Sequence, residues 1–588
     1  MSTMPRRYLA LAVAALAAAL PQTVELSYLA SERQLGPVAY RDPLGAPSPD
    51  GAWLATTSGL RLFLRPLQGG AVRELGPGTQ RVNELVWSLD SRTLYAHESN
   101  YPRTEHGWFE YDPITGDRAE AAAIKRMFGG VEASAGVAGI SSGQFRNLSF
   151  GPASAAATLT ANGASRLLRF DLETGRARQI ASSSRFHATA WHPDGTVACV
   201  RGEARELELD CGGSRNLVAA NVYDRVVIDS SGRVVFARTD ESGTLDLWES
   251  ANGAEPHRLT RFARDAYAPY LVAGDEIVFR VQDYRISLAT IPATGGEVQT
   301  VTTFQSETPS WDRTGDRLAF TFGTWRRKAD DAHYPDIDQH IGIVEVGGEL
   351  PASEPHHIVR SSYSEDQGMH WSPDGRWIVL HSHANATDDL WLQPADGSLP
   401  AWPITRGGHE TGWPRWSDDG RTIIYPTEMD DGSGRVRGHV LSLEIDSETG
   451  EVVRPAEPIP LTDYDGSVNF AEFAPDGENI YFESHDGIGK RSLRRVSIAG
   501  GSPQVVHRYE SEQWYSALAV SPDGRWLVYV APGAHGKFQL YRVPAVGGEP
   551  EQLTVDDTDK THPTWSPAGD RIAFSVFNYE SSFWQLTR

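Results

Sequence analysis

The sequence predicts an all-β protein built as tandem β-propellers, and three observations carry that prediction. A strand–turn–strand signature recurs along the chain, further short extended segments follow each copy, and sustained helical periodicity is almost absent. The clearest copy runs from Trp371 to Trp377. In it Pro373 fixes φ, Asp374 can bond its own backbone, and Gly375 tolerates a positive φ, which together favour a tight turn between two strands.

The turn has counterparts along the rest of the chain, at Ser48–Gly51, Ser88–Ser91, His192–Gly195, Asp229–Gly232, Asp312–Gly315, Ser417–Gly420, Ala474–Gly477, Ser521–Gly524 and Ser566–Gly569. Degraded copies near Gly151 and Ala273 complete a set of twelve, spaced by about 47 residues. Many copies are preceded by a tryptophan and followed by an apolar strand, a third strand, a glycine-rich turn and a fourth strand. Four antiparallel strands at this period are typical of propeller blades.

Twelve four-stranded blades exceed the usual four to eight of one ring, so two six-bladed propellers are predicted. The expected division is 1–20 as a signal peptide, 21–300 as the first propeller and 301–588 as the second. A seven-plus-five split is the alternative. The last copy ends after its third strand, Phe583–Leu586, and Val24–Leu29 is expected to supply the missing outer strand. The Ala-rich stretch Arg118–Met127 is the one candidate helix.

The repeats resemble a known blade type. The Trp-Ser-Pro-Asp-Gly turn, the Asp-x-Leu-Trp pattern of the third strand (Asp389 to Leu392) and the Gly-Gly-x-x-x-x-Leu-Thr ending (Gly547 to Thr554) are similar to the blades of the TolB family. They also resemble the N-terminal propeller of tricorn-type proteases. The resemblance extends over residues 40 to 588. Because TolB is a periplasmic partner of an envelope lipoprotein, it implies an exported binding role.

Composition, charge and the N-terminal segment narrow the classes of binding partner and the cellular location of the protein. The formal net charge is -23 and the chain has no basic block, so a nucleic-acid phosphate backbone would be repelled. Arg6, Arg7 and the apolar run Tyr8–Leu20 are typical of a secretory signal, with an uncleaved anchor as the alternative. No later segment is apolar for long enough to span a membrane. A periplasmic or secreted protein is expected.

The two cysteines, Cys199 and Cys211, flank a predicted hairpin. An exported protein could oxidise them, whereas simple hairpin pairing leaves them about three residues out of register. The sequence therefore leaves open whether the two cysteines form a disulfide or stay reduced. Neither cysteine has the spacing of a zinc site.

Two sets of residues are candidates for a binding site. The first is the loop 323–340, which concentrates charged and aromatic side chains; its candidate ligand-binding residues are Trp325, Arg326, Arg327, Asp336, Asp338 and His340. The alternative is a salt-bridged loop over the channel mouth. The second set is His381 and His383, which alternation places on one strand face, with Asp388 and Asp389 close behind.

His370 and His485 extend the second set, and four imidazoles could hold a divalent metal. Oligogalacturonate lyases are propeller enzymes that resemble TolB-type blades and bind a metal through His and Gln, so the resemblance implies a possible metal here. The Gln-x-x-His-x-His string of those enzymes is incomplete at Gln367–His370. Neutral histidines that only donate and accept hydrogen bonds are the alternative.

No catalytic residue or required cofactor is predicted. Gly139–Gly143 matches Gly-x-Ser-x-Gly, yet a nucleophile elbow needs an α/β sheet that the sequence lacks. The favoured function is an exported, non-enzymatic scaffold that recognises a protein, peptide or glycan at a channel mouth. The alternatives are a metal-dependent polysaccharide lyase or hydrolase, and a propeller module whose peptidase or amidohydrolase catalysis resides on another chain.

Overall fold

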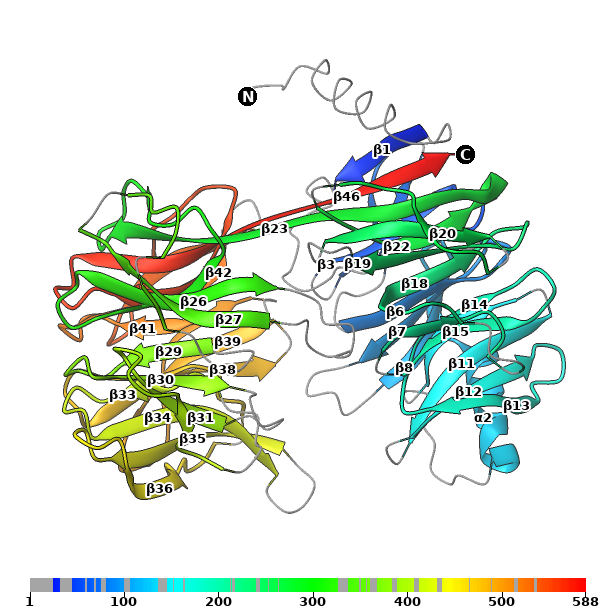
Figure 1. The fold of residues 1–588 in the computed structure, drawn as a ribbon. Coiled ribbons are helices and arrows are strands. Elements are labelled where there is room, and N and C mark those ends of the chain that lie inside the picture. Colours follow the sequence, from blue (N-terminus) through cyan, green and yellow to red (C-terminus); the bar gives the residue numbers. More distant parts are fainter. Residues whose placement is uncertain are drawn as a thin grey trace. The chain divides into compact units, whose positions relative to one another are not determined.

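The computed structural model describes residues 25–31 and 45–587, apart from short segments of which the longest are 76–80, 100–105, 136–144, 326–336, 360–366, 383–388, 407–411, 431–435 and 512–516. The described residues form an all-β structure with a single α-helix, α2 (Ala122–Ala135) (Figure 1). The predicted fold class is confirmed. The predicted signal at 1–20 lies outside the described residues.

The chain divides into two compact units. The first contains the described residues up to Asp283 together with Glu580–Thr587, and the second contains Tyr284–Trp325 and Ile337–Tyr579. This division differs from the predicted one at 300/301, because it falls inside a single long strand and returns the end of the chain to the first unit.

Five four-stranded antiparallel sheets belong wholly to the first unit. Their strands, from the inner to the outer edge, are β2 (Gly45–Pro47), β3 (Trp53–Ser58), β4 (Arg61–Pro66) and β5 (Arg73–Leu75); β6 (Arg81–Trp87), β7 (Leu94–Ser99), β8 (His106–Tyr111) and β9 (Arg118–Glu120); β10 (Phe145–Phe150), β11 (Ser154–Ala161), β12 (Ala164–Asp171) and β13 (Ala177–Ser183); β14 (Phe186–Trp191), β15 (Val197–Arg201), β16 (Glu206–Glu208) and β17 (Leu217–Ala219); and β18 (Val222–Ile228), β19 (Arg233–Thr239), β20 (Leu245–Ala251) and β21 (His257–Arg258).

Five more such sheets belong to the second unit. They are β25 (Ser306–Trp311), β26 (Arg317–Trp325), β27 (Ile337–Glu345) and β28 (His357–Val359); β29 (Gln367–Trp371), β30 (Trp377–Ser382), β31 (Asp389–Pro394) and β32 (Trp402–Pro403); β33 (Arg415–Trp416), β34 (Thr422–Asp430), β35 (Val436–Ile445) and β36 (Val452–Pro458); β37 (Ala471–Phe473), β38 (Asn479–Gly487), β39 (Lys490–Ser497) and β40 (Gln504–Glu510); and β41 (Leu518–Val520), β42 (Trp526–Pro532), β43 (Phe538–Pro544) and β44 (Glu551–Gln552).

The remaining strands form one six-stranded sheet that supplies a blade to each unit. Its members are β1 (Glu25–Ser31), β22 (Asp265–Val272), β23 (Glu276–Pro292), β24 (Gln299–Thr300), β45 (Asp559–Trp565) and β46 (Arg571–Thr587), and the short 3-10 turn η3 (Ala273–Asp275) joins β22 to β23. The order β22-β23-β46-β1 completes the first unit, and β45-β46-β23-β24 completes the second. Each unit therefore has six four-stranded blades among its described residues.

The inner strands close both rings. In the first unit each of β2, β6, β10, β14, β18 and β22 packs against the next, and β22 packs against β2. In the second unit β25, β29, β33, β37, β41 and β45 do the same, and β45 packs against β25. Trp311 of the first of these strands donates its indole N–H to the Thr564 carbonyl of the last, at 3.3 Å. Each unit is therefore a closed six-bladed propeller.

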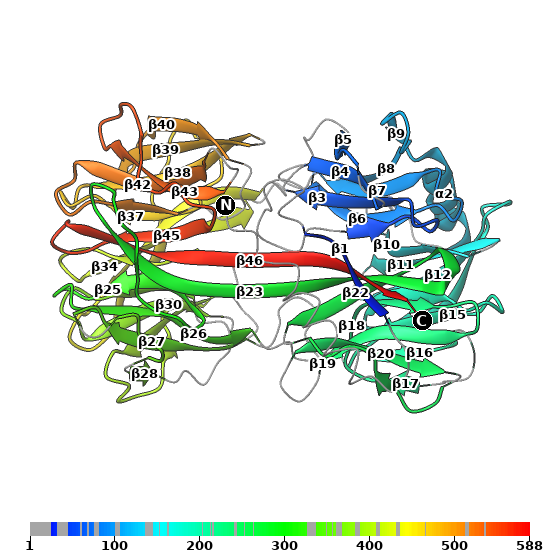
Figure 2. The same cartoon turned by 90° about the horizontal axis from the view of Figure 1, so that it is seen from above.

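The exchange of two 17-residue strands is the feature that the repeats did not predict. β23 and β46 lie side by side, and each takes part in the closing blade of both rings (Figures 1 and 2). The predicted pairing of the N-terminal strand is confirmed, since Glu25 lies opposite Thr587 and Tyr28 opposite Trp584. Phe583–Leu586, however, belongs to the first propeller rather than to a third strand of the last repeat.

The recurrent turn forms as predicted, and its hydrogen bonds and backbone angles account for the residues that recur in it. Ser372 Oγ donates to Asp374 at 2.6 Å and accepts the Trp377 N–H at 2.9 Å, while Gly375 has a φ of 74°. The same serine-to-aspartate bond occurs at Ser88, Ser417 and Ser521. Short polar side chains thus satisfy the backbone donors that the turn leaves open.

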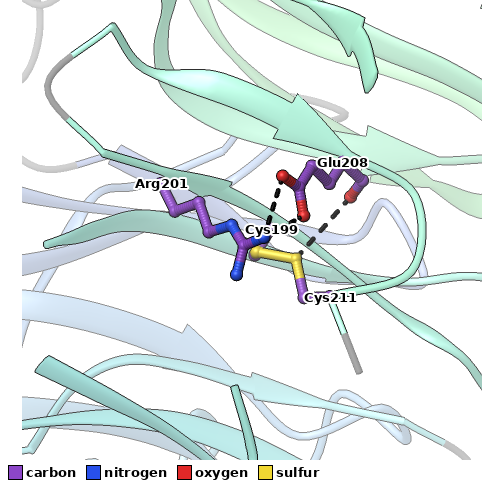
Figure 3. The surroundings of a disulfide bond; sticks show 4 residues. All are labelled: Cys199, Arg201, Glu208 and Cys211. Carbon is purple, nitrogen blue, oxygen red and sulfur yellow. Dashed lines mark hydrogen bonds and ion pairs between the residues drawn. A yellow bond between two sulfur atoms is a disulfide. The ribbon is translucent and has the colours of Figure 1, made fainter. Parts of the chain in front are cut away.

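Cys199 and Cys211 form a disulfide (Figure 3). The β15–β16 register pairs Cys199 with Glu208, which confirms the predicted offset of three residues. After Glu208 the chain leaves the strand, and the Cys211 N–H donates to the Val197 carbonyl at 3.0 Å. That turn brings the two Cα atoms to 6.0 Å, within bridging distance.

Among the described residues, no helix combines the length and apolar character needed to cross a bilayer.

The strand exchange predicts which propeller depends on the C-terminus. Removing residues 580–588 deletes the buried side chains of Phe583 and Leu586 from the first unit, so that unit should lose about 4 kcal/mol of unfolding free energy. Hydrogen exchange should accelerate in β1, β22 and the first half of β23, while β25 and β45 keep their protection. A chain lacking only Arg588 is the control. Faster exchange confined to β45 would contradict the exchanged topology.

Candidate functional site at the mouth of the second channel

The candidate site grows from the inner strands of the second propeller. Counting back three places from the last residue of each inner strand gives Thr308, Gly368, Trp413, Phe470, Ala517 and His562. The ring brings four of them together, namely Gly368, Trp413, Phe470 and His562. The rings of Trp413 and His562 lie 4.2 Å apart between centroids, and those of Trp413 and Phe470 lie 5.0 Å apart. Since Trp413 precedes the third inner strand and His562 lies on the sixth, their contact spans the channel.

Gly368 makes room for this aromatic layer. A Cβ atom built on Gly368 would lie 2.3 Å from Cγ of Trp413, closer than two such atoms can approach. Its φ of 60° is also in the left-handed region that favours glycine. The indole of Trp413 therefore occupies space that any other residue at position 368 would take.

Bulges in the inner strands aim these side chains. The register shifts between Glu307 and Ser310 and between Thr561 and Thr564, and Thr308 and His562 have φ values of 56° and 53°. A bulge adds one residue on one strand and turns its side chain away from the regular alternation. Non-glycine residues with positive φ carry local strain, which is frequent at binding and catalytic sites.

Glu307 lies beside the aromatic layer at the start of the inner strand β25. Its side chain keeps 10% of its surface exposed, and its Oε1 atom lies 3.9 Å from Nδ1 of His562. Burial raises the pKa of Glu307 from 4.5 to about 8, with no charged or hydrogen-bonding neighbour as a second cause. At neutral pH the carboxyl group is therefore mostly protonated.

Two imidazoles at this mouth, those of His370 and His562, are neutral because their pKa values are lowered. Burial, followed by the positive charge of Arg415, lowers the pKa of His370 to about 3 and that of His562 well below 6.5. The Nδ1 atom of His370 accepts the Trp416 N–H at 3.2 Å, which joins the second blade to the third. The Arg415 guanidinium forms an ion pair with Glu472 of the fourth blade. Burial raises the pKa of Glu472, and Arg415 opposes that shift.

We call Glu307, His370, Trp413, Arg415, Glu472 and His562 the channel cluster. It comes from five of the six blades of one propeller and offers a neutral acid, two neutral imidazoles, an indole face and an ion pair. Beside it, the Nδ2 atom of Asn469 is buried and has no hydrogen-bond partner among the described residues. Such a set suits recognition of a small polar group over an aromatic floor.

The predicted histidines among the described residues lie on three different strands. His381 on β30 lies opposite Gln367, and His485 on β38 lies two blades further on. Burial lowers the pKa of His485 to about 3. Within the described ranges, no three His, Cys, Asp or Glu side chains come close enough to hold a metal ion. His383 lies outside the described residues, so a metal that uses it stays a prediction.

Of the predicted loop residues, His340 lies on β27 opposite Phe322, at the end of the first blade where Glu307 also lies. Trp325 and Asp338 belong to β26 and β27. Outside the described residues lie Arg326, Arg327, Asp336 and Asp388.

Asp389 has a structural partner. Its carboxylate accepts the Thr405 hydroxyl at 3.1 Å, and that hydroxyl oxygen accepts the Leu390 N–H at 2.8 Å. Asp246, Thr260 and Leu247 repeat the arrangement in the first unit. The recurrent Asp on the third strand and the Thr just after the fourth strand therefore hold the two outer strands of a blade together.

Sequence reasoning missed Glu307, Trp413, Arg415, Glu472 and His562. Part of the signal was present, because aligning the inner strands on their last residues places Trp413 with His562 and Arg415 with Glu472, whereas Glu307 matches none of the others. Their polarity and size vary from blade to blade while the flanking tryptophans recur.

Comparison with known proteins gives several similarities. No protein-family model matches the chain. An uncharacterized protein of Agrobacterium fabrum is 27% identical over 318 residues, covering 53% of this chain and 89% of that protein. A solved structure assigned as TolB from Agrobacterium tumefaciens is 18% identical with a TM-score of 0.39, covering 50% of this chain and 99% of that one.

The tricorn protease is 13% identical with a TM-score of 0.29, covering 89% of this chain and 62% of its own. Oligogalacturonate lyase in complex with manganese is 12% identical with a TM-score of 0.31, covering 55% of this chain and 96% of the lyase chain. The propeller classes that the repeats resemble are thus among the solved structures similar to this chain.

Replacing Gly368 by Ala tests the packing of the channel layer. The added methyl group collides with Trp413 at a positive φ, so we expect a loss of about 3 kcal/mol in unfolding free energy and an altered tryptophan emission. Gly375→Ala is the matched control, since Gly375 has a φ of 74° and no atom lies within 4 Å of the position that its Cβ would take; it should lose about 1 kcal/mol. Equal losses would show that Trp413 does not fill this space.

Glu307→Gln should change how stability depends on pH. Because the pKa of Glu307 is about 8 in the folded protein and near 4.5 unfolded, its contribution is fully present below pH 4.5 and is lost as pH rises through 8. The glutamine variant lacks this loss. Between pH 4.5 and pH 9, the unfolding free energy of wild type should therefore fall by up to about 5 kcal/mol more than that of the variant. Urea unfolding across that range measures the difference. Parallel profiles for both proteins would contradict a raised pKa.

Proposed function

We propose that this chain is an exported, non-enzymatic binding protein that recognises a protein, peptide or glycan at the channel mouth of its second propeller. The observation that carries the proposal is the channel cluster, in which neutral hydrogen-bonding groups surround an aromatic floor. Sites of this kind bind ligands by orienting polar groups above an apolar contact. The blades supply the rigid frame that holds one residue of each strand near the axis.

Two further observations support export. Residues 1–20 have the pattern of a secretory signal. The Cys199–Cys211 disulfide suits an oxidising compartment, since such bonds are rare in the cytosol. A fusion of residues 1–40 to a reporter that is active only outside the cytoplasm would test this part of the proposal.

A ligand screen tests the binding role. Purified protein is probed with a glycan array and a displayed peptide library, and retained ligands are measured again with Trp413→Ala. We expect binding to weaken at least tenfold, because the indole forms the floor of the site. Trp402→Ala removes a half-buried tryptophan of the outer strand β32 and should leave binding unchanged. Ligands that bind both variants like wild type, or the absence of any ligand, would contradict the proposal.

A further inference from the structure

Glu307 differs from seven other buried carboxylates of the described residues, each of which is paired with a permanent cation. These seven pair with Arg or Lys: Glu98 with Arg118, Glu208 with Arg201, Asp229 with Arg233, Asp246 with Arg258, Asp312 with Arg317, Glu483 with Arg491 and Asp559 with Lys537. Among the described residues, the ion-pair partner of Glu307 is the imidazole of His562 at 3.9 Å. Since that imidazole is neutral, the carboxyl group has no permanent cation among the described residues.

One neighbour of this carboxyl group favours a positive charge and one opposes it. Next to His562 lies the indole of Trp413, and aromatic faces attract cations through their quadrupole. The guanidinium of Arg415 opposes it, since its charge helps to lower the pKa of His562, and its ion pair with Glu472 reduces that effect. An incoming cation therefore meets a carboxyl group and aromatic rings, with the nearby positive charge already paired.

Access limits the size of the ligand group. Glu307 lies in an inner strand with 10% of its side chain exposed, so only a slim group can reach its oxygen atoms from the mouth. An ammonium group on a flexible chain is compact, whereas a guanidinium is broad and planar. Both a lysine side chain and a free peptide N-terminus present such an ammonium group.

We propose that the channel mouth of the second propeller binds a primary ammonium group of a peptide, with Glu307 as its counterion and Trp413 beside it. This inference rests on the proposed function and narrows its ligand class. It also assigns a role to the strained inner-strand bulges, which hold Glu307 and His562 at one place in the ring.

Binding should be coupled to loss of a proton. At neutral pH Glu307 is mostly protonated, and pairing with an ammonium group requires the carboxylate. The O–H bond of Glu307 breaks, its proton passes to solvent, and a carboxylate–ammonium pair takes its place. The charged and titratable groups of the neighbouring inner strands are His562 on β45, which lies 3.9 Å from Glu307, Arg415 on β33, whose charge acts on His562 and on His370 of β29, and Glu472 on β37, which pairs with Arg415. The two histidines are already neutral, so they release no proton.

Calorimetry with defined peptides tests the proposal. The probes are Ac-Ala-Lys-Ala-NH2, with a side-chain ammonium, and H-Ala-Ala-Ala-NH2, with a terminal one; Ac-Ala-Ala-Ala-NH2 lacks both, and glucosamine represents an amino sugar. Titrations at pH 7 in phosphate and in Tris, which differ in ionisation enthalpy, give the number of protons released. We expect one ammonium peptide to bind with release of about 0.9 proton, since pH 7 lies one unit below a pKa of 8.

Variants separate this site from other sites. Glu307→Gln should weaken the ammonium peptide at least tenfold and abolish proton release, whereas Glu448→Gln, at an exposed turn, should change neither. Binding of the blocked peptide with equal strength, binding without proton release, preference for glucosamine, or no binding of either ammonium peptide would each overturn the proposal. If library ligands still need Trp413 but ignore Glu307→Gln, the binding function stands and the ammonium assignment fails.

Discussion

The exchange of β23 and β46 between two rings is the constraint on which the rest of this structure depends. A propeller closes only when its first and last blades meet, and here both closures use the same pair of strands. The sheet β45-β46-β23-β24 joins the beginning of the second ring to its end by backbone hydrogen bonds. Each ring is thus fastened by chain segments that lie far apart in sequence, a closure that must overcome the entropy of long loops.

Closure also creates the candidate site. Trp413 and His562 lie about half of the second propeller apart in the sequence, and their rings meet because the third and sixth blades face each other across one channel. Glu307 joins them from the first blade, whose inner strand packs against that of the sixth. The burial that raises the pKa of Glu307 is therefore a property of the closed ring and of no single blade.

The repeats were enough to predict the blades. Each serine-aspartate-glycine turn is local, so its hydrogen bonds are encoded within six residues, and the twelve copies give the blade number. The strand exchange was not predictable in this way. Residues 283 and 579 lie within continuous strands, and the local pattern of a strand that crosses to another ring is the same as that of one that turns back.

The site was harder to predict for a related reason. His381 and His485 attracted attention because they lie in motifs, and they occupy the second and fourth blades. Glu307 and Arg415 lie in short inner strands without a motif, and their chemistry comes from neighbours that only the ring supplies. Asp389 recurs because it fastens a blade, as its bond to Thr405 shows. Residues that recur from blade to blade thus have a structural role, whereas the residues of the candidate site differ from blade to blade.

Chemical cross-linking tests the central claim of exchanged strands most directly. The side chains of Glu276 on β23 and Gln585 on β46 form a hydrogen bond in the first unit. With Gln585→Lys, a carbodiimide should join position 585 to Glu276, and peptide mass mapping should recover the linked pair. A link from position 585 to residues of the second propeller, with none to Glu276, would contradict the exchange.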